Sequence, residues 1–401
     1  MAKWNPEKRV LNHQHTRFWR FELRDVDEPN LQKEVFPYEE VSRIDFDHRI
    51  IPIQPAEEIF ITDTTFRDGQ QARPPYTVQQ IVDLYSLMNR LGGENGIIRQ
   101  TEFFLYSRKD KEGVARCQDL GLRYPEITGW IRAAKEDIPL VKEAGLKETG
   151  ILTSVSDYHI FLKLNKKRSE ALNDYLDIVR AILDAGIVPR CHFEDITRAD
   201  IYGFCIPFAL ELMKLREESG IDIKIRLCDT MGYGVTYPGA SLPRSVDKLV
   251  RAFIDDAGVP GHLLEWHGHN DFHKALINAT TAWLYGCSAA NSTLLGLGER
   301  TGNPPIEGLI MEYIGLMGRT NGIDTTVITD IAQYFRNKID FKIPANFPFV
   351  GSDFNVTRAG VHADGLIKNE EIYNIFDTTK ILKRPIVPMV TDKSGKAGIA
   401  Y

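Results

Sequence analysis

The amino-acid sequence predicts an α/β fold, a closed (β/α)8 TIM barrel with an N-terminal extension and a small C-terminal subdomain. Between residue 59 and about residue 300, eight short runs rich in β-forming residues alternate with longer segments of helical period. Polar residues follow several of these runs directly. The alternation is typical of βαβ units, and eight strands in sequence favour a closed barrel over an open sheet.

The eight predicted strands are short, apolar and rich in β-branched or aromatic residues. They are Ile59–Thr62, Ile97–Phe103, Glu126–Ile131, Leu146–Thr153, Ile187–Phe193, Ile221–Cys228, Leu263–Trp266 and Cys287–Leu295.

The segments between the strands carry helix signals. Thr77 is a suitable N-cap for a helix whose apolar residues recur every three or four positions until Gly92 and Gly93 end it. Similar apolar stripes end at Gly186 and before Gly258. We interpret these stripes as faces that cover the barrel.

The chain is expected to divide into an N-terminal extension at 1–57, a catalytic barrel at 58–320 and a C-terminal helical subdomain at 321–401. The extension carries aromatic residues without a clear period, and it is expected to pack on the barrel or on a partner subunit. Those residues are Trp4, Phe18, Trp19, Phe21 and Phe36. A helical stretch, Thr326–Phe335, begins the C-terminal part.

Composition favours a small-molecule enzyme. The formal charge is −6, with both signs interspersed, so there is no basic footprint for nucleic acid. No run approaches the ~18 apolar residues of a membrane span, and the first residues lack the apolar stretch of a secretory signal. Five widely spaced cysteines fit buried free thiols better than disulfides. We therefore expect a cytoplasmic protein without a nucleic-acid or membrane partner.

A metal site is predicted at the ends of the first and seventh strands. His267 and His269 are two residues apart, so both imidazoles point to the same side of an extended strand. Asp68 offers a carboxylate oxygen from the end of the first strand. Two histidines and one carboxylate leave coordination positions open for a substrate.

Arg67 allows two interpretations, and the glycine-rich segment after the eighth predicted strand excludes one. Arg67 offers a cation for charge that develops on an oxygen, or it forms a structural ion pair with Glu194 or Glu299. The glycines at 296–302 have the wrong spacing for a dinucleotide-binding loop.

Three segments together resemble the DRE-TIM metallolyases: Asp63–Asp68, His267–Asp271 and Gly298–Asn303. The resemblance covers residues 59 to about 385. It implies a TIM barrel with a divalent metal, and residues 298–303 resemble the members that condense acetyl-CoA with a 2-oxo acid. One departure is Gln70, where most members of the superfamily carry glutamate.

The resemblance also implies roles for individual residues. It implies metal ligation by Asp68, His267 and His269 with Asn303 close by, polar catalytic roles for Arg67 and Glu194, a substrate contact for Thr230 and an acid/base role for His362. Tyr373 resembles a tyrosine that members send into a neighbouring subunit, which implies a homodimer. Mn2+ is the expected metal, with Co2+, Mg2+ and Zn2+ as alternatives, and acetyl-CoA is the expected co-substrate.

The 2-oxo acid is expected to be a dicarboxylic acid. Arg190 shares a strand face with Glu194, and the homocitrate synthases carry an arginine at the matching position. A branched-chain substrate would leave this guanidinium buried and unpaired, whereas a distal carboxylate would pair with it. His192, where homocitrate synthases have serine, favours the shorter acid. Arg132 is a further candidate substrate-binding residue.

The predicted reaction is therefore condensation of acetyl-CoA with oxaloacetate to give citrate and CoA. Isopropylmalate or homocitrate synthesis, with 2-oxoisovalerate or 2-oxoglutarate as substrate, remains as an alternative. A carbon–carbon lyase of the hydroxymethylglutaryl-CoA lyase type is an alternative of another class, and a non-catalytic effector-binding barrel is a third.

Overall fold

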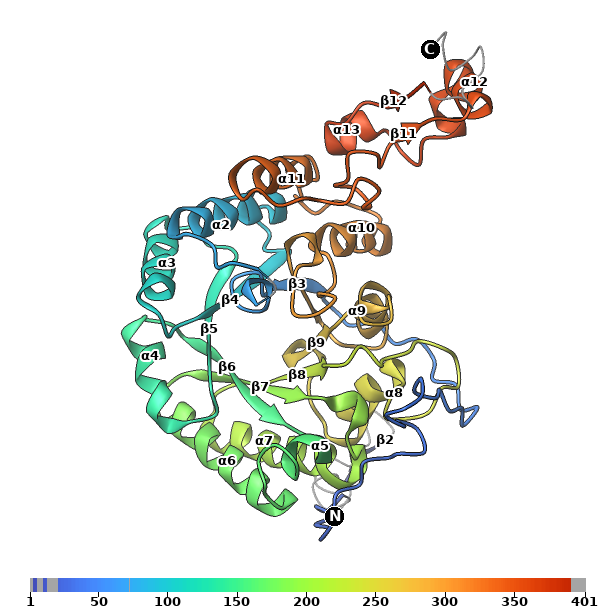
Figure 1. Ribbon diagram of the computed structural model, residues 1–401. Helices are drawn as coiled ribbons and strands as arrows, with labels where there is room; N and C mark the ends of the chain where they lie inside the picture. Colours follow the sequence, from blue (N-terminus) through green and yellow to red (C-terminus); the bar gives the residue numbers. More distant parts are fainter. Residues whose placement is uncertain (1–2, 6–9, 13–20, 72, 391–401) are drawn as a thin grey trace.

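Eight parallel strands form a closed barrel in the computed structural model, which describes residues 3–5, 10–12, 21–71 and 73–390 (Figure 1). The strands are β3 (Phe60–Asp63), β4 (Ile98–Phe104), β5 (Glu126–Ile131), β6 (Glu148–Ser154), β7 (Val188–Glu194), β8 (Lys224–Asp229), β9 (Leu264–Gly268) and β10 (Ala289–Ser292). They neighbour one another in sequence order, and β10 pairs with β3 to close the barrel. The predicted fold class is confirmed.

Helices surround the sheet on its outer face (Figure 1). They are α2 (Val78–Gly92), α3 (Arg108–Asp119), α4 (Ile138–Glu143), α6 (Arg168–Asp184), α7 (Ile206–Ser219), α8 (Val246–Arg251), α9 (Ala275–Leu284) and α10 (Ile306–Met317). Thr77 caps α2 as predicted: its hydroxyl accepts from the backbone N–H of Gln80 at 3.2 Å, while the Gln80 side chain accepts from the backbone N–H of Thr77 at 2.9 Å.

Charged side chains fill much of the barrel interior. Arg226 lies between two buried carboxylates, 2.9 Å from Glu102 and 2.7 Å from Glu265. Arg190 pairs with Glu265 at 3.2 Å and with Glu148 at the first residue of β6. Glu102, Glu148 and Glu265 thus each have an arginine partner. An unpaired charge in this position would cost several kcal/mol.

Some buried carboxyls have no such cation among the described residues, and one of them lies in α10. Glu307, in the first turn of α10, accepts a hydrogen bond from the Leu295 backbone at 3.2 Å, and burial raises its pKa from 4.5 to about 7. Between those two pH values the folded protein binds more protons than the unfolded chain. The free energy of unfolding therefore falls as the pH rises through this interval.

We expect Glu307→Gln to stabilise the protein by roughly 2 kcal/mol at pH 8 and to leave it unchanged near pH 4.5, because the amide is never ionised. Urea unfolding at both pH values measures the difference. Glu217→Gln, at an exposed position of α7, is the control. A gain in stability of the same size at both pH values would contradict this assignment.

The first helix of the C-terminal part packs on the barrel, and the elements after it lie farther away. The helix α11 (Val327–Lys338) packs against α2, where Tyr334 donates to Asp83 at 2.6 Å and Asp330 pairs with Arg90 at 2.7 Å. Farther along the chain, α12 (Gly360–Lys368), η8 (Glu370–Ile372), α13 (Thr378–Leu382) and the parallel strands β11 (Val356–Thr357) and β12 (Val387–Pro388) form a unit that stands off the barrel (Figure 1). We call the unit at residues 355–390 the C-terminal module.

The described part of the N-terminal extension runs over the outside of the barrel. Phe36 is buried against Tyr233, and the ring of Phe21 lies 5.1 Å from that of Tyr202 in the segment before α7. Packing on the barrel is thus confirmed for these two aromatics. Phe18 and Trp19 lie outside the described residues, as does the side chain of Trp4, which falls in β1 (Lys3–Asn5), paired with β2 (Val10–Asn12).

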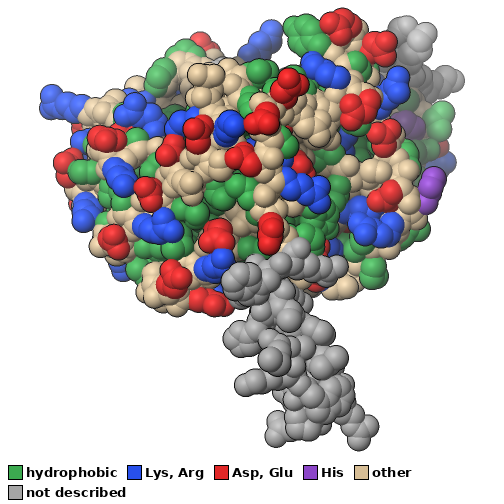
Figure 2. Space-filling view, turned by 90° about the horizontal axis from the view of Figure 1, so that it is seen from below, with side chains coloured by type: hydrophobic (Ala, Val, Ile, Leu, Met, Phe, Trp, Pro, Cys, Tyr) green, Lys and Arg blue, Asp and Glu red, His purple; other side chains and the backbone are tan. Residues whose placement is uncertain are grey.

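The surface carries both charge signs. Lys and Arg side chains alternate with Asp and Glu side chains over the face in Figure 2, so that face has no field of one sign that could follow a phosphate backbone. Among the described helices, none combines the length and the apolar character that crossing a bilayer requires.

Candidate active site

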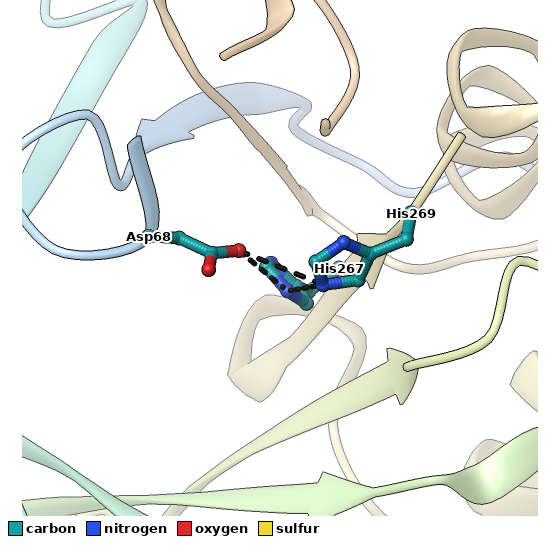
Figure 3. A group of neighbouring side chains, drawn as sticks. All are labelled: Asp68, His267 and His269. Atoms are coloured by element: carbon teal, nitrogen blue, oxygen red, sulfur yellow. Dashed lines mark hydrogen bonds and ion pairs between the residues drawn. The ribbon is translucent and has the colours of Figure 1, made fainter. Parts of the chain in front are cut away.

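Asp68, His267 and His269 meet at the carboxyl end of the barrel (Figure 3). Asp68 begins the turn η1 (Asp68–Gln70) after β3, while the histidines end and follow β9. Asp68 Oδ2 lies 3.5 Å from His267 Nε2 and 3.6 Å from His269 Nε2, and the two nitrogens are 3.3 Å apart. Ligands about 2.1 Å from one ion and roughly 105–120° apart are separated by such distances.

Unpartnered buried atoms at this position fit a metal. Among the described residues, Asp68 Oδ2 and the neighbouring Asn303 Oδ1 are buried and have no hydrogen-bond partner. Asn303 donates to the Gly268 carbonyl at 3.0 Å, which holds it beside the histidine strand. A buried carboxylate oxygen without a donor is costly, so this donor set suits a divalent cation.

The protonation states also suit a metal. Burial lowers the pKa of His267 to about 3, so its ring is neutral at pH 7. Burial alone would raise the pKa of Asp68, but Arg67 and the two histidines outweigh burial and lower it. The His267 Nδ1 lies 2.7 Å from Asn291 Oδ1, and this contact fixes which nitrogen faces the site.

Arg67 is held at the edge of the site by Glu102 of β4. Its Nε donates to Glu102 at 2.8 Å, and its guanidinium lies 6.0 Å from the ring of Trp130. The alternative interpretation, a structural ion pair with Glu194 or Glu299, was wrong in its partner, because Glu102 is the carboxylate that pairs with Arg67. Burial raises the Glu102 pKa, but Arg226, His192 and Arg67 outweigh it and hold the pKa well below 4.5.

Glu194 ends β7 inside a group of donors. His159 Nδ1 lies 3.0 Å and Lys163 Nζ 3.2 Å from its carboxylate, and Ser154 donates to it. Burial raises its pKa, but these partners more than offset burial and lower the pKa to about 2. Glu194 is therefore ionised at neutral pH, and it is too weak a base to be the main acceptor of a carbon-bound proton.

Two other predicted substrate contacts lie near this rim. The hydroxyl of Thr230 accepts from the backbone N–H of Asp195 at 2.8 Å, and so supports the turn after Glu194. Arg132 follows β5 and forms two hydrogen bonds of 2.8 Å with Asp137. The structure thus gives both residues partners within the chain.

Arg190 and His192 lie deeper than the substrate argument assumed. Arg190 contacts Glu148 and Gln100, near the amino ends of β6 and β4, which is the end of the barrel opposite the metal site. The premise that only a distal carboxylate could pair with Arg190 was wrong, because Glu148 and Glu265 already do so. His192 lies 3.3 Å from Glu102 in space that Gly150 leaves open.

The departure at Gln70 has a local explanation. The Gln70 amide donates to the Phe66 carbonyl at 2.6 Å, while its carbonyl accepts from the Tyr76 backbone at 3.1 Å and from Lys109 at 2.9 Å. An amide satisfies both kinds of partner, whereas a carboxylate could not donate to Phe66. Gln70 therefore fixes the loop that carries Asp68.

His362 and Tyr373 do not lie at the metal site of their own chain. Both are exposed in the C-terminal module, and their rings are 4.2 Å apart. Figure 1 shows α12 far from the barrel end of β9. The chain thus brings Arg67 and Asp68 together with the two histidines but leaves His362 and Tyr373 outside.

Sequence reasoning missed several polar residues of the site. Glu102 and Asn291 lie inside predicted strands, where a polar side chain was itself a signal that it faces a polar interior. His159 and Lys163 belong to α5 (Asp157–Ile160) and the turn after it. Nothing in their local pattern separated them from surface residues.

Comparisons with known proteins show the family of this chain. The model of the HMGL-like family matches residues 58–335. A protein of Syntrophus aciditrophicus (strain SB) named Citrate (Re)-synthase is 90% identical over 401 residues, which are 100% of this chain and 64% of that protein. One of the same name from Clostridium kluyveri is 54% identical over 95% of this chain and 84% of its own.

A solved structure is similar in fold. HMG-CoA lyase of Bacillus subtilis superposes with a TM-score of 0.56 and 18% identity, over 73% of this chain and 97% of that one. At this identity the likeness shows the barrel alone. The chain spans 64% of the length of the Syntrophus relative, so that relative's activity is not transferred to this chain by identity alone.

Proposed function

This chain belongs to the HMGL-like family, and from that premise we propose that it condenses acetyl-CoA with oxaloacetate to give citrate and CoA. The observation that carries the proposal is the Asp68, His267 and His269 triad in a chain 90% identical to a protein named Citrate (Re)-synthase. We propose that this chain, like the relative so named, is a Re-type citrate synthase.

The proposed metal is Mn2+, with Co2+, Mg2+ and Zn2+ as alternatives, since imidazole and carboxylate ligands suit all four. Asp68, His267 and His269 would hold it, with Asn303 beside them. When bound, such an ion acts as a Lewis acid on a keto oxygen. The guanidinium of Arg67, fixed by Glu102, faces the same region and stabilises negative charge on an oxygen of the substrate.

The reaction needs a base for a methyl proton of acetyl-CoA. Glu194 is unsuitable because its pKa is about 2, whereas an imidazole suits proton transfer near neutral pH. We assign this role to His362. The carbanion equivalent forms a bond to C2 of oxaloacetate, the keto oxygen gains a proton, and water cleaves the thioester to release citrate and CoA.

His362 and Tyr373 reach a site only if another chain supplies it. Both are exposed on a module that stands off its own barrel, next to exposed apolar side chains such as Val361 and Ile372. We propose a homodimer in which each module covers the barrel rim of the other subunit.

The CoA portion is proposed to bind beside the rim, between β5, β6 and α6. A cavity of about 620 Å³ there is lined by Trp130, by Lys135 and Lys166, and by Asp174, which pairs with Lys166 in this structure. Lys163 lines this cavity and also forms an ion pair with Glu194. Lysines at the mouth suit the phosphates of CoA, and the apolar wall suits its pantetheine arm.

We expect Lys135→Ala combined with Lys166→Ala to raise KM for acetyl-CoA roughly 10-fold with little change in kcat, since about 1.4 kcal/mol of phosphate binding is lost. Steady-state kinetics at saturating oxaloacetate measures both constants. Lys142→Ala, exposed on α4, is the matched control. An unchanged KM would place CoA elsewhere.

The cysteines indicate the compartment in which the enzyme works. All five cysteines are free and buried, as suits a reducing compartment, and we place the enzyme in the cytoplasm. Its partners are small molecules.

The experiment that tests the function is CoA release from acetyl-CoA with Mn2+ and, separately, oxaloacetate, 2-oxoglutarate, 2-oxoisovalerate or pyruvate. We expect oxaloacetate to give the highest kcat/KM by at least about 100-fold, or about 2.7 kcal/mol. Preference for 2-oxoisovalerate would keep the barrel and metal site but overturn the substrate. Absence of thiol release with all four would overturn the condensation.

A further inference from the structure

A second cavity, of about 670 Å³, lies away from the metal site, between the N-terminal extension and the outside of the barrel. The extension contributes Phe21, Arg24 and Arg49 to its wall. The barrel contributes the segment before α7, the loop before α8 and Asp256, which ends η5 (Ala252–Asp256). The volume is in the usual range for small-molecule sites.

Two arginines and two carboxylates line this cavity, but they do not pair with one another. Its two carboxylates already have partners: Asp200 pairs with Arg168 at 3.0 Å, and Asp256 accepts from Tyr202 at 2.9 Å. Neither Arg24 nor Arg49 forms an ion pair or a side-chain hydrogen bond with any residue in the described ranges. Asp256 keeps its negative charge, because a tyrosine hydroxyl is neutral, but neither lining carboxylate pairs with Arg24 or Arg49. Two guanidinium groups therefore remain available to pair with an anion in this cavity.

The wall of this cavity is connected to the catalytic rim. The Asn30 backbone N–H donates to Asp157 at 2.7 Å, and Asp157 begins α5, which carries His159 beside Glu194. Gln32 donates to the carbonyl of Arg198 at 3.0 Å. The buried Arg168 bonds both Asp157 and the carbonyl of Arg24, so one side chain links the arginine segment to α5.

A second contact reaches the turn after β7. Arg198 Nε donates to Asp195 at 3.0 Å, and Asp195 follows Glu194 directly with a positive φ of 66°. A non-glycine residue holds that conformation only where its surroundings support it. The extension thus contacts both segments that position Glu194.

We propose that this cavity is an effector site for a small organic anion with at least two negative charges, held by Arg24 and Arg49. Its apolar part packs on Phe21, Leu242 and Pro243. Binding stabilises the seated extension and, through Asp157 and Arg198, the surroundings of Glu194. This inference does not depend on the reaction that the barrel catalyses, because binding is measured without turnover.

The test is isothermal calorimetry of the full-length protein with ATP, inorganic phosphate and succinate as separate probes. We expect at least one probe to bind with a Kd below about 1 mM. The double variant Arg24→Gln, Arg49→Gln should weaken that binding at least roughly 10-fold. Arg319→Gln, exposed in the turn after α10, is the matched control and should bind as the unchanged protein does.

Amide hydrogen exchange gives an independent readout. The bound anion is expected to slow exchange in residues 24–36 and 157–160 of the unchanged protein but not of the double variant. Selective binding of ATP or phosphate identifies a phosphorylated effector, and selective binding of succinate a carboxylated one; either result supports the proposal. Failure of all three probes to bind, or equal binding by the double variant, would overturn it.

Discussion

Asp68→Ala is expected to lose at least about 1000-fold in kcat and to lose tight binding of Mn2+, because the triad would keep only two imidazoles. Asp68 is buried between Arg67 and the histidines, and its Oδ2 lacks any donor among the described residues. Without this anion the site has no negative charge to offset the ion. Calorimetric titration with Mn2+ and steady-state CoA release measure the two losses separately.

Asp119→Ala is the matched control, since Asp119 is exposed at the end of α3. Removing metal from the unchanged protein with a chelator should reproduce the kinetic defect of Asp68→Ala, and adding Mn2+ should reverse it only in the unchanged protein. Retention of Mn2+ affinity and of turnover in Asp68→Ala would refute the assigned metal site.

Two variants that are each inactive are expected to restore activity when mixed. His362→Ala leaves the metal triad intact, and Asp68→Ala leaves the C-terminal module intact. If His362 acts on the partner's barrel, a mixed dimer has one site with both Asp68 and His362. Random exchange of subunits then restores roughly one quarter of the original rate, because half the dimers are mixed and each has one complete site.

The two variants are to be unfolded, mixed and refolded together, and CoA release is then compared with that of each variant refolded alone. Mixing His362→Ala with His267→Ala should give the same recovery. A mixture of Asp68→Ala with His267→Ala is the control without recovery, because both changes damage the barrel site. Activity that never exceeds the sum of the separate variants would contradict the action of His362 in the partner's site.

Much of the barrel could be predicted because local patterns specified it. Each strand was a short β-forming run, and the capping residues Thr77 and Gln80 occur at the spacing that a helix start requires. The candidate metal ligands followed from the same rules, since His267 and His269 share a strand face whatever the neighbours are. Only Asp68 required the assumption that the first and seventh strands end at the same rim.

Pairings across the barrel could not be predicted from spacing. Arg190 was assigned to substrate because its strand face was known while its neighbours were not; Glu148 and Glu265 come from strands far apart in the sequence. The partner of Arg67 was wrong for the same reason, because Glu102 lies inside β4 and not in one of the polar segments that follow the predicted strands. The position of His362 depends on a module that stands off its own barrel, and the local sequence pattern does not specify where that module lies.

The ionic interior of the barrel constrains how this protein can change over evolutionary time. Replacing Glu265 by a neutral residue would leave both Arg190 and Arg226 without that carboxylate, at a cost of about 3–5 kcal/mol. A compensating change must therefore arise almost together with the first. Among descendants of this sequence, we expect these positions to be exchanged in coordinated groups, while the apolar residues beneath the helices drift one at a time.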